Sequence, residues 1–497
     1  MNGFQALRRL ESWKEGRPLP RGETLHFPLA DDEETLVLAF VKMGGESSPW
    51  GIAWGRPGRE PEVAVVPEPR NRDLAAEMLA GFAPALLGHL FHPDHSDLQV
   101  YGPDIPRPLR QLWLPNASHV EMLHHLQYGY AFARRGDPER IPTLNALGRA
   151  AGWLFREFNR PGQVLVMAAT EALKESFVFP CEDVRQGHLG YLLAWLTEPG
   201  DREARRNAAA VAERASVSTA LTPSVEKLEL EERVDRYGAA VRDGRDREVA
   251  RLTREIADVL SAELKRRFEL TATALTRLRA DGRRTNRHVD ELTRDGWTAH
   301  YRGYLETERR LADASGDPVF VPSPETDRHP SWAARNYFTQ QGCDDRRRSL
   351  LLDDDVEMQA EAIAAGEAVH GTIRRVRDEG RGRATLPVWE VETDDEAPTK
   401  LRKDKDVFVA RLRGRKGRIR DIRLEDGKTV FTIVITDLKT VPRLNVGGAV
   451  LPATDGRLAG QRVVLLPATA EGIHDRKRKK LGARGVPGEW LTDSAPS

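Results

Sequence analysis

The first third of the chain alternates between strand-like and helix-like patterns of apolar residues. Leu36, Leu38 and Phe40 are spaced two apart, and residues 50–54 and 63–66 form further short apolar segments between glycine and proline breaks. This period predicts strands within residues 24–66. Asn71 or Asp73 then stands where a helix cap is expected. The helix that follows is predicted from its apolar positions, which are Leu74, Met78, Leu79, Phe82, Leu86 and Leu87.

A proline-rich bridge over residues 93–115 leads into a dense apolar region at 118–197. Residues 120–132, 144–158 and 189–196 have helical spacing, whereas 163–167 and 176–179 are short enough for strands. The aromatic residues of this region fall mostly at helical spacing, which favours a packed core over a cofactor site. We therefore expect residues 1–200 to form a mixed α+β domain with an aromatic-rich core.

Residues 201–312 are rich in alanine, arginine and glutamate, and their apolar positions repeat at threes and fours. One stripe is predicted to lie on a long helix between the breaks at Asp243-Gly244 and Asp281-Gly282. This pattern indicates a helical bundle or a coiled-coil-like arm. The stripe comprises Val249, Leu252, Ile256, Val259, Leu260, Leu264, Phe268, Leu275 and Leu278.

The last third of the sequence is predicted to form a linker with a short acidic helix at 313–365, a small β-barrel at 366–470 and a basic flexible tail at 471–497. Residues 407–411 and 431–435 alternate as strands do, and Asp426-Gly427 is a favoured hairpin turn. Five or more short strands suggest an OB-like barrel. The predicted fold class is thus multidomain α+β: a mixed N-terminal domain, a helical arm and a small C-terminal barrel.

Charge is balanced overall, with 76 Lys+Arg and 76 Asp+Glu, so any attraction to a polyanion must be local. Residues 371–440 carry 18 Lys/Arg and 13 Asp/Glu. Alternate arginines on one strand lie roughly 7 Å apart, a spacing suited to successive phosphates, and Trp389 and Phe408 would add base stacking if exposed. The alternative is a solvated face whose arginines pair with Asp404, Asp406, Asp421 and Glu425. The candidate nucleic-acid-binding residues are Arg411, Arg413, Arg415, Lys416, Arg418, Arg420 and Arg423.

A second candidate site is a cluster of histidines between residues 89 and 125. With Asp94 and Asp97 it offers ligands that zinc accepts, although the segment matches neither the His-Glu-x-x-His nor the His-x-His-x-Asp-His pattern. A structural role for these histidines is the alternative. The cluster comprises His89, His92, His95, His119, His124 and His125.

Other chemistry is weakly indicated. Cys181 and Cys343 are the two cysteines, which excludes a disulfide framework, and Cys181 is expected to be a buried, inert thiol. Glu171, Lys174 and Glu175 resemble a fragment of a nuclease site without its partner aspartate. Asp353–Asp355 fit the start of a helix better than a cation site. Neither a P-loop nor a dinucleotide-binding glycine motif is present, so we expect no cofactor.

Neither a signal peptide nor a membrane-spanning run is indicated, which predicts a cytoplasmic protein without a membrane partner. Arginine far exceeds lysine and alanine is abundant, a composition typical of GC-rich bacterial genes. The predicted small barrel with basic residues loosely resembles the β modules attached to nucleic-acid helicases, and no residue role is carried over from them.

We expect a noncatalytic, nucleic-acid-binding adaptor of a bacterial DNA/RNA-processing or phage-defence complex, acting with a separate ATP-driven motor or nuclease. The alternatives are a metal-dependent hydrolase or nuclease using the histidine cluster, and a protein–protein scaffold.

Overall fold

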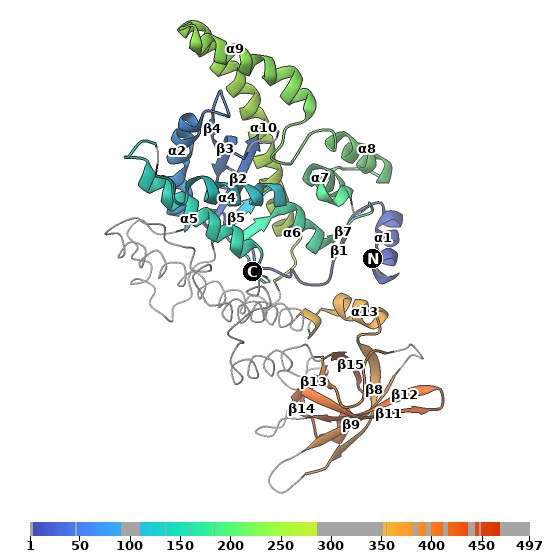
Figure 1. Cartoon of the computed structure of the whole chain (residues 1–497). Helices are drawn as coiled ribbons and strands as arrows, with labels where there is room; N and C mark the ends of the chain where they lie inside the picture. The colour runs from blue at the N-terminus through green and yellow to red at the C-terminus, as the bar shows by residue number, and fades with distance from the viewer. Residues whose placement is uncertain are drawn as a thin grey trace, which may run out of the picture. The chain divides into compact units, whose positions relative to one another are not determined.

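A computed structural model describes residues 3–44, 47–90, 110–134, 136–160, 162–182, 184–285, 351–353, 355–380, 386–393, 399–410, 416–435, 443–446 and 449–467. The fold is mixed α/β, as predicted, and has two compact units (Figure 1). The larger, here the N-terminal unit, is Arg8–Arg21 with Leu25–Val321. The C-terminal unit is Met1–Leu7, Gly22–Thr24 and Pro322–Ser497.

The N-terminal unit is built on a five-stranded sheet with the order β4-β3-β2-β5-β6. Strands β2 (Thr35–Lys42), β3 (Pro49–Gly55) and β4 (Glu62–Val65) form an antiparallel meander, which confirms the strands predicted within 24–66. β5 (Gln111–Leu114) pairs in parallel with β2, and β6 (Val166–Ala168) in parallel with β5. The strand pattern did not predict β5, because its four residues end a proline-rich segment.

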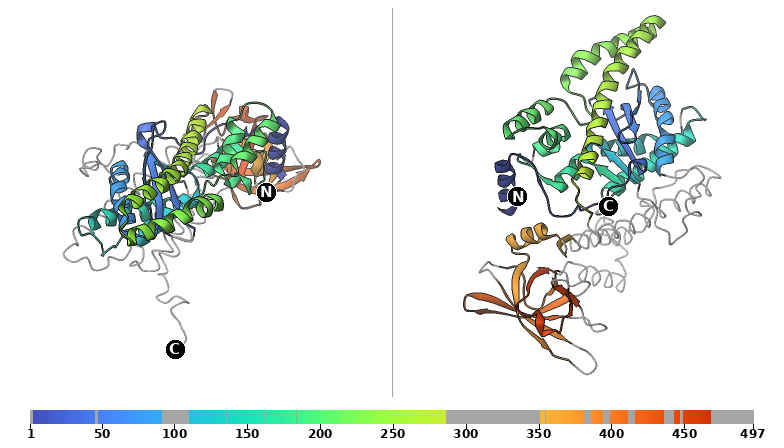
Figure 2. Two further views of the ribbon diagram at one scale, coloured as in Figure 1. Left: turned by 90° about the horizontal axis from the view of Figure 1, so that it is seen from above. Right: turned by 180° about the vertical axis from the view of Figure 1, so that it is seen from behind.

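Helices cover both faces of this sheet. On one face, α2 (Arg72–Leu90) brings Phe82 to Trp54, and α4 (Ala117–Tyr130) and α5 (Ile141–Phe158) pack beside it. On the other face, the 35-residue α10 (Asp246–Ala280) lies across the strands (Figure 2). Because α10 approaches β3 so closely, a Cβ atom at Gly51 would lie 2.8 Å from Leu264 Cδ1. A larger residue there would force the helix or its side chains to move.

The apolar stripe predicted for residues 249–278 is correct, but its main partner is the sheet. Ile256, Leu260, Leu264 and Phe268 are buried in the same core as the strands. Only the start of α10 forms a hairpin, with α9 (Glu231–Arg242), around the predicted break at Gly244. The apolar stripe of α10 is broader than the narrow seam of a coiled coil, as is typical of a helix that packs on a sheet. The helical character expected of residues 201–312 is confirmed for most of residues 201–280, and residues 286–312 lie outside the described residues. A coiled-coil packing of α10 is not confirmed.

None of the helices that the structure describes is long and apolar enough to cross a membrane.

The remaining elements of the described N-terminal region are short. These elements are α1 (Gly3–Glu15), β1 (Leu19–Pro20), the 3-10 helix η1 (Asp32–Glu34), α6 (Ala169–Ser176), β7 (Phe177–Val178), η2 (Arg185–Gly187), α7 (Leu189–Thr197), α8 (Arg202–Ala212) and the π-helix η3 (Ser224–Leu230).

The C-terminal unit contains a six-stranded antiparallel sheet with the order β10-β11-β12-β9-β8-β15. β15 also pairs with β10, so the ring of pairings closes. Its inward residues, among them Trp389 and Phe431, form a separate core. The OB-like assignment stays a prediction. The elements are α13 (Val356–Ala364), β8 (Val369–Asp378), β9 (Pro387–Thr393), β10 (Asp406–Val409), β11 (Lys416–Glu425), β12 (Lys428–Ile435), β13 (Arg443–Val446), β14 (Ala449–Pro452), η4 (Gly456–Leu458) and β15 (Arg462–Pro467).

Local capping and turn signals in the sequence are confirmed. The Asn71 side chain accepts hydrogen bonds from the backbone amides of Asp73 and Leu74, at 3.1 and 3.2 Å, at the start of α2. The Asp355 side chain does the same for α13. Asp426 and Gly427 both have positive φ, 50° and 78°, as a tight turn between β11 and β12 requires.

A buried arginine on α10 joins the helix to the loop between α8 and η3. The Arg267 side chain is fully buried, and its guanidinium donates to the carbonyl oxygens of Ser218 (2.9 Å) and Ala220 (3.3 Å). It also forms an ion pair with Glu263 Oε2 at 2.6 Å. Burial lowers the pKa of Arg267 to about 10, so the side chain is still charged at neutral pH.

We predict that Arg267→Ala destabilises the N-terminal unit by about 3–5 kcal/mol, because the buried loop carbonyls and Glu263 would lose their partner. The measurement is urea unfolding followed by tryptophan fluorescence, since six of the seven described tryptophans lie in this unit. Arg254→Ala, at an exposed position of the same helix, is the matched control and is expected within about 0.5 kcal/mol of the wild type. Equal effects of the two substitutions would contradict the role given to Arg267.

Candidate functional site

The carboxyl ends of the parallel strands are the first place to look for a site, because open α/β sheets bind ligands there. In this protein the loop at residues 215–221 lies against that edge. Lys42, the last residue of β2, donates its amide to Thr219 O at 2.8 Å. Asn116, just beyond β5, donates its side-chain amide to Val217 O at 3.2 Å. The edge is therefore occupied by the chain itself.

This loop is held through its backbone carbonyl groups. Each carbonyl oxygen from residue 215 to residue 220 accepts a hydrogen bond, and the donors come from four different parts of the unit. The donors are His188 to Ala215, Arg266 to Ser216, His119 and Asn116 to Val217, Arg267 to Ser218, the Lys42 amide to Thr219, and Arg267 to Ala220.

His119 and His89 have structural surroundings. The amide of Phe40 donates to His119 Nδ1 at 3.0 Å, and His119 Nε2 donates to Val217 O at 3.0 Å. His89 Nε2 lies 3.1 Å from Gln111 O, and its Nδ1 lies 3.1 Å from a guanidinium nitrogen of Arg56. With both ring nitrogens engaged, neither histidine has a lone pair left for a metal.

Burial keeps both imidazoles neutral. It lowers the pKa of His89 to about 3, with a further contribution from the Arg56 charge. It lowers the pKa of His119 to about 3 as well, with a further contribution from Arg267.

The other members of the histidine cluster do not join these two. His124 stacks on Phe155, with ring centroids 4.3 Å apart, and His125 lines a cavity described below. His92 and His95 lie outside the described residues. Among the residues that the structure describes, no group of three or more His, Cys, Asp or Glu side chains could hold a metal ion.

The weaker candidates also have local partners. Cys181 is buried, as expected. Lys174 pairs with Glu171 at 2.9 Å within α6, and Glu175 lies 3.8 Å from His26. Asp355 caps α13, which is the helix-start role expected for the acidic run.

The basic run of the C-terminal unit falls partly outside the described residues. Arg411, Arg413 and Arg415 lie there, and only the backbone of Lys416 is described. Arg418, Arg420 and Arg423 lie on β11 with exposed side chains, the most exposed being Arg418 at 56%.

A β-bulge at Arg420 brings these arginines to one surface. Ile419 pairs with Ile433 and Asp421 pairs with Thr432, so Arg420 is an extra residue in β11. Strict alternation would place Arg418 and Arg423 on opposite faces, because they are five residues apart. The extra residue puts both on the outer face, opposite the core side chains of Ile419 and Ile433. Sequence spacing cannot reveal this, since the bulge depends on the pairing with β12.

The outer face of strands β8, β9, β11 and β12, hereafter the arginine face, is a lattice of ion pairs. Arg420 contacts Glu379 at 2.8 Å, and Arg423 lies 3.6 Å from both Glu390 and Glu425. Arg374, the extra residue of a second bulge in β8, contacts Glu425 at 2.6 Å and Glu392 at 3.5 Å. Further pairs are Arg377–Glu390, Lys428–Glu392, Lys403–Asp421 and Arg418–Asp404. The predicted acidic partners Asp404, Asp421 and Glu425 are thus in place.

The aromatic residues expected beside these arginines do not lie on this face. Trp389 is fully buried, and its indole nitrogen donates to Ala453 O at 2.7 Å. Phe408 is partly buried against α13 and β15 residues. Trp389 is therefore a core residue, and the arginine face offers charge without its stacking surface.

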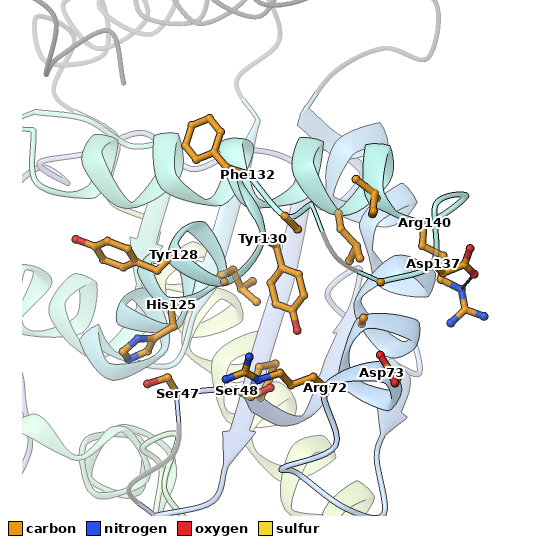
Figure 3. A pocket seen from close by; sticks show the side chains of 18 of the residues that line it. Ser47, Ser48, Arg72, Asp73, His125, Tyr128, Tyr130, Phe132, Asp137 and Arg140 are labelled. Carbon is orange, nitrogen blue, oxygen red and sulfur yellow. Dashed lines mark ion pairs between the residues drawn. The ribbon is translucent and has the colours of Figure 1, made fainter. Parts of the chain in front are cut away.

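A cavity of about 1550 Å³ lies in the N-terminal unit (Figure 3). Its walls come from the start of β3, the start of α2, the last turns of α4 and the connection to α5. They include Tyr128 and Phe132, which are 79% and 44% exposed. The sequence did not predict this site, because its walls come from four separate segments. Its charged lining residues are Arg70, Arg72, Arg134, Arg140, Asp73 and Asp137.

The floor of the cavity is polar. The Tyr130 hydroxyl points toward Ser48 and Arg72 (Figure 3), and burial raises the pKa of Tyr130 despite its hydrogen bond with Ser48. At another side Arg140 pairs with Asp137 at 3.2 Å and with Glu77 at 3.6 Å.

No family model, curated protein or solved structure matches this chain.

We predict that acid destabilises the N-terminal unit through its two buried histidines. Their folded-state pKa values, about 3, lie below the usual unfolded value of about 6.5. Below pH 6.5 the unfolded chain binds protons on these histidines that the folded chain does not bind. The free energy of unfolding therefore falls with falling pH, by about 1.4 kcal/mol per pH unit for each histidine.

The test is urea unfolding between pH 7 and pH 4.5. His119→Gln is expected to lower the free energy of unfolding at pH 7. Its free energy of unfolding should also fall less steeply with falling pH, by the roughly 1.4 kcal/mol per pH unit that one histidine contributes. His89→Gln should behave likewise. Because carboxylates titrate equally in the wild type and the variants, the difference isolates each imidazole. An unchanged slope in both variants would contradict the neutral assignment.

Proposed function

We propose that this protein is a noncatalytic nucleic-acid-binding adaptor that acts with a separate motor or nuclease in a bacterial DNA/RNA-processing or phage-defence complex. The observation that carries the proposal is the gathering of Arg418, Arg420 and Arg423 on one exposed face by the bulge in β11. The basic segment 411–415 directly precedes this strand in the sequence.

The ion pairs on the arginine face are compatible with phosphate binding. Exposed pairs contribute only about 0–1 kcal/mol each, so an arginine can exchange a carboxylate for a phosphate at little cost. Guanidinium groups also bind phosphate in two-point geometry. The glutamates between them would disfavour a loosely placed polyanion and favour one whose phosphates follow the arginines.

The described part of the N-terminal unit supports a binding role more than a catalytic one. The carboxyl edge of the N-terminal sheet is filled by residues 215–221, and His89 and His119 are committed to hydrogen bonds. Because neither nucleotide-binding motif stands in the sequence, the energy for any directed movement would come from another chain. A scaffold that offers the arginine face to an acidic protein is the competing interpretation.

We predict that Arg418→Gln, Arg420→Gln and Arg423→Gln together weaken nucleic-acid binding by the full chain. The slope of log K against log salt concentration should fall by about three, roughly one for each phosphate that an arginine no longer neutralises. The measurement is fluorescence anisotropy with labelled single- and double-stranded oligonucleotides between 50 and 300 mM salt, about the range in which binding to phosphates responds.

A triple variant of Arg247, Arg251 and Arg254 to glutamine, at exposed positions of α10, makes the same change of charge elsewhere and serves as the control. It is expected to leave the slope within about one of the wild type. Equally weakened binding in both triple variants would remove the arginine face from the interface. No binding at low salt by the folded wild type would reject the adaptor proposal and favour the scaffold.

A further inference from the structure

The cavity of the N-terminal unit has the features of a ligand site. Its volume of about 1550 Å³ exceeds the roughly 300–1,000 Å³ of sites for small molecules, which favours a longer ligand that enters in part. Its lining carries four arginines and two aspartates, without lysine or glutamate. Both its size and its charge thus favour an extended anion.

Two exposed aromatic rings stand at the cavity. Tyr128 is 79% exposed on the last turn of α4, and Phe132 follows four residues later. Tyrosine and phenylalanine side chains are enriched where proteins bind partners, and an exposed ring has a face available for stacking. The Tyr128 ring packs against the ring of His124, with ring centroids 4.6 Å apart, and His124 stacks in turn on Phe155. A planar ligand would therefore meet a supported ring.

The opposite side of the cavity supplies donors. Arg72 is exposed at the start of α2, and it forms no ion pair with any residue that the structure describes. Its guanidinium lies near Ser48 and the hydroxyl of Tyr130 (Figure 3). Arg140 is held at a third side by its pair with Asp137. Aromatic rings and guanidinium groups in one concave surface are the combination that binds single-stranded nucleic acid.

We propose that this cavity binds a segment of single-stranded nucleic acid, with bases stacked on Tyr128 and Phe132 and phosphates near Arg72. The proposal rests on the proposed function, and it adds a second binding site to the arginine face. A duplex is disfavoured, because its stacked bases cannot lie on the two rings.

Gly129 offers a direct way to obstruct the cavity. It lies in α4 among the lining residues, and a Cβ atom there would meet no other atom within 4 Å. A side chain at this position therefore extends into open space, and replacing a glycine within a helix adds stability of up to about 1 kcal/mol. Gly129→Glu adds a carboxylate beside the proposed path of the phosphates. Gly129→Gln adds nearly the same volume without the charge and is the matched control.

The test is binding of labelled single-stranded DNA and RNA by the full chain, together with photochemical crosslinking of bromouracil-containing oligonucleotides. Tyr128→Ala and Phe132→Ala should each weaken binding about 5- to 100-fold, because the bases could no longer stack there. Gly129→Glu should weaken binding at least about tenfold more than Gly129→Gln does, and raising the salt concentration should narrow that difference. Crosslinks are expected within residues 126–140.

The outcomes separate the two proposals. Crosslinks confined to the C-terminal unit, with binding unchanged in Tyr128→Ala, Phe132→Ala and Gly129→Glu, would overturn the cavity inference and leave the arginine face in place. Crosslinks within 126–140 that persist in the arginine-face triple variant would support the cavity alone. No binding by any folded form would overturn both. Thermal unfolding of each variant shows whether its fold is intact, and Gly129→Gln is expected to be at least as stable as the wild type.

Discussion

The N-terminal unit depends on a charge with no access to water. Arg267 is fully buried, and its attraction to Glu263 offsets a desolvation cost that would otherwise expel a guanidinium from the core. The remaining donors of Arg267 fix two carbonyl groups of the loop at 215–221. One side chain thus joins α10 to the segment that covers the carboxyl edge of the sheet.

Because residues 215–221 cover the carboxyl edge of the sheet, the candidate binding surfaces lie elsewhere. In many α/β proteins the ends of the parallel strands form the site, whereas here they contact the protein's own backbone. Among the described residues, two surfaces with exposed, chemically distinctive groups are the arginine face and the cavity beside α4. They are complementary in kind, because one offers guanidinium groups without an exposed aromatic ring and the other offers rings with fewer charges.

Local signals in the sequence predicted local structure well. The cap at Asn71, the turn at Asp426-Gly427 and the stripe on α10 each depend on a few neighbouring residues. The features that decide function depend on pairing partners distant in the sequence. β5 is recognisable only once β2 lies beside it, the bulge at Arg420 only against β12, and the cavity only when α2 and α4 are packed. The buried position of Trp389, by contrast, follows the alternation of its own strand, in which Trp389 and Val391 are fully buried and Glu390 is not.

The bulge in β11 has a consequence for how this surface can change over evolutionary time. Arg420 is one residue beyond what the pairing with β12 requires. Losing it would straighten the strand and yet keep Arg418 outward and Ile419 inward, because the alternation on each side already agrees. Insertion of a residue elsewhere in β11 would instead turn half of the strand over. Divergent homologues should therefore tolerate a one-residue gap at this position and at few others along the strand.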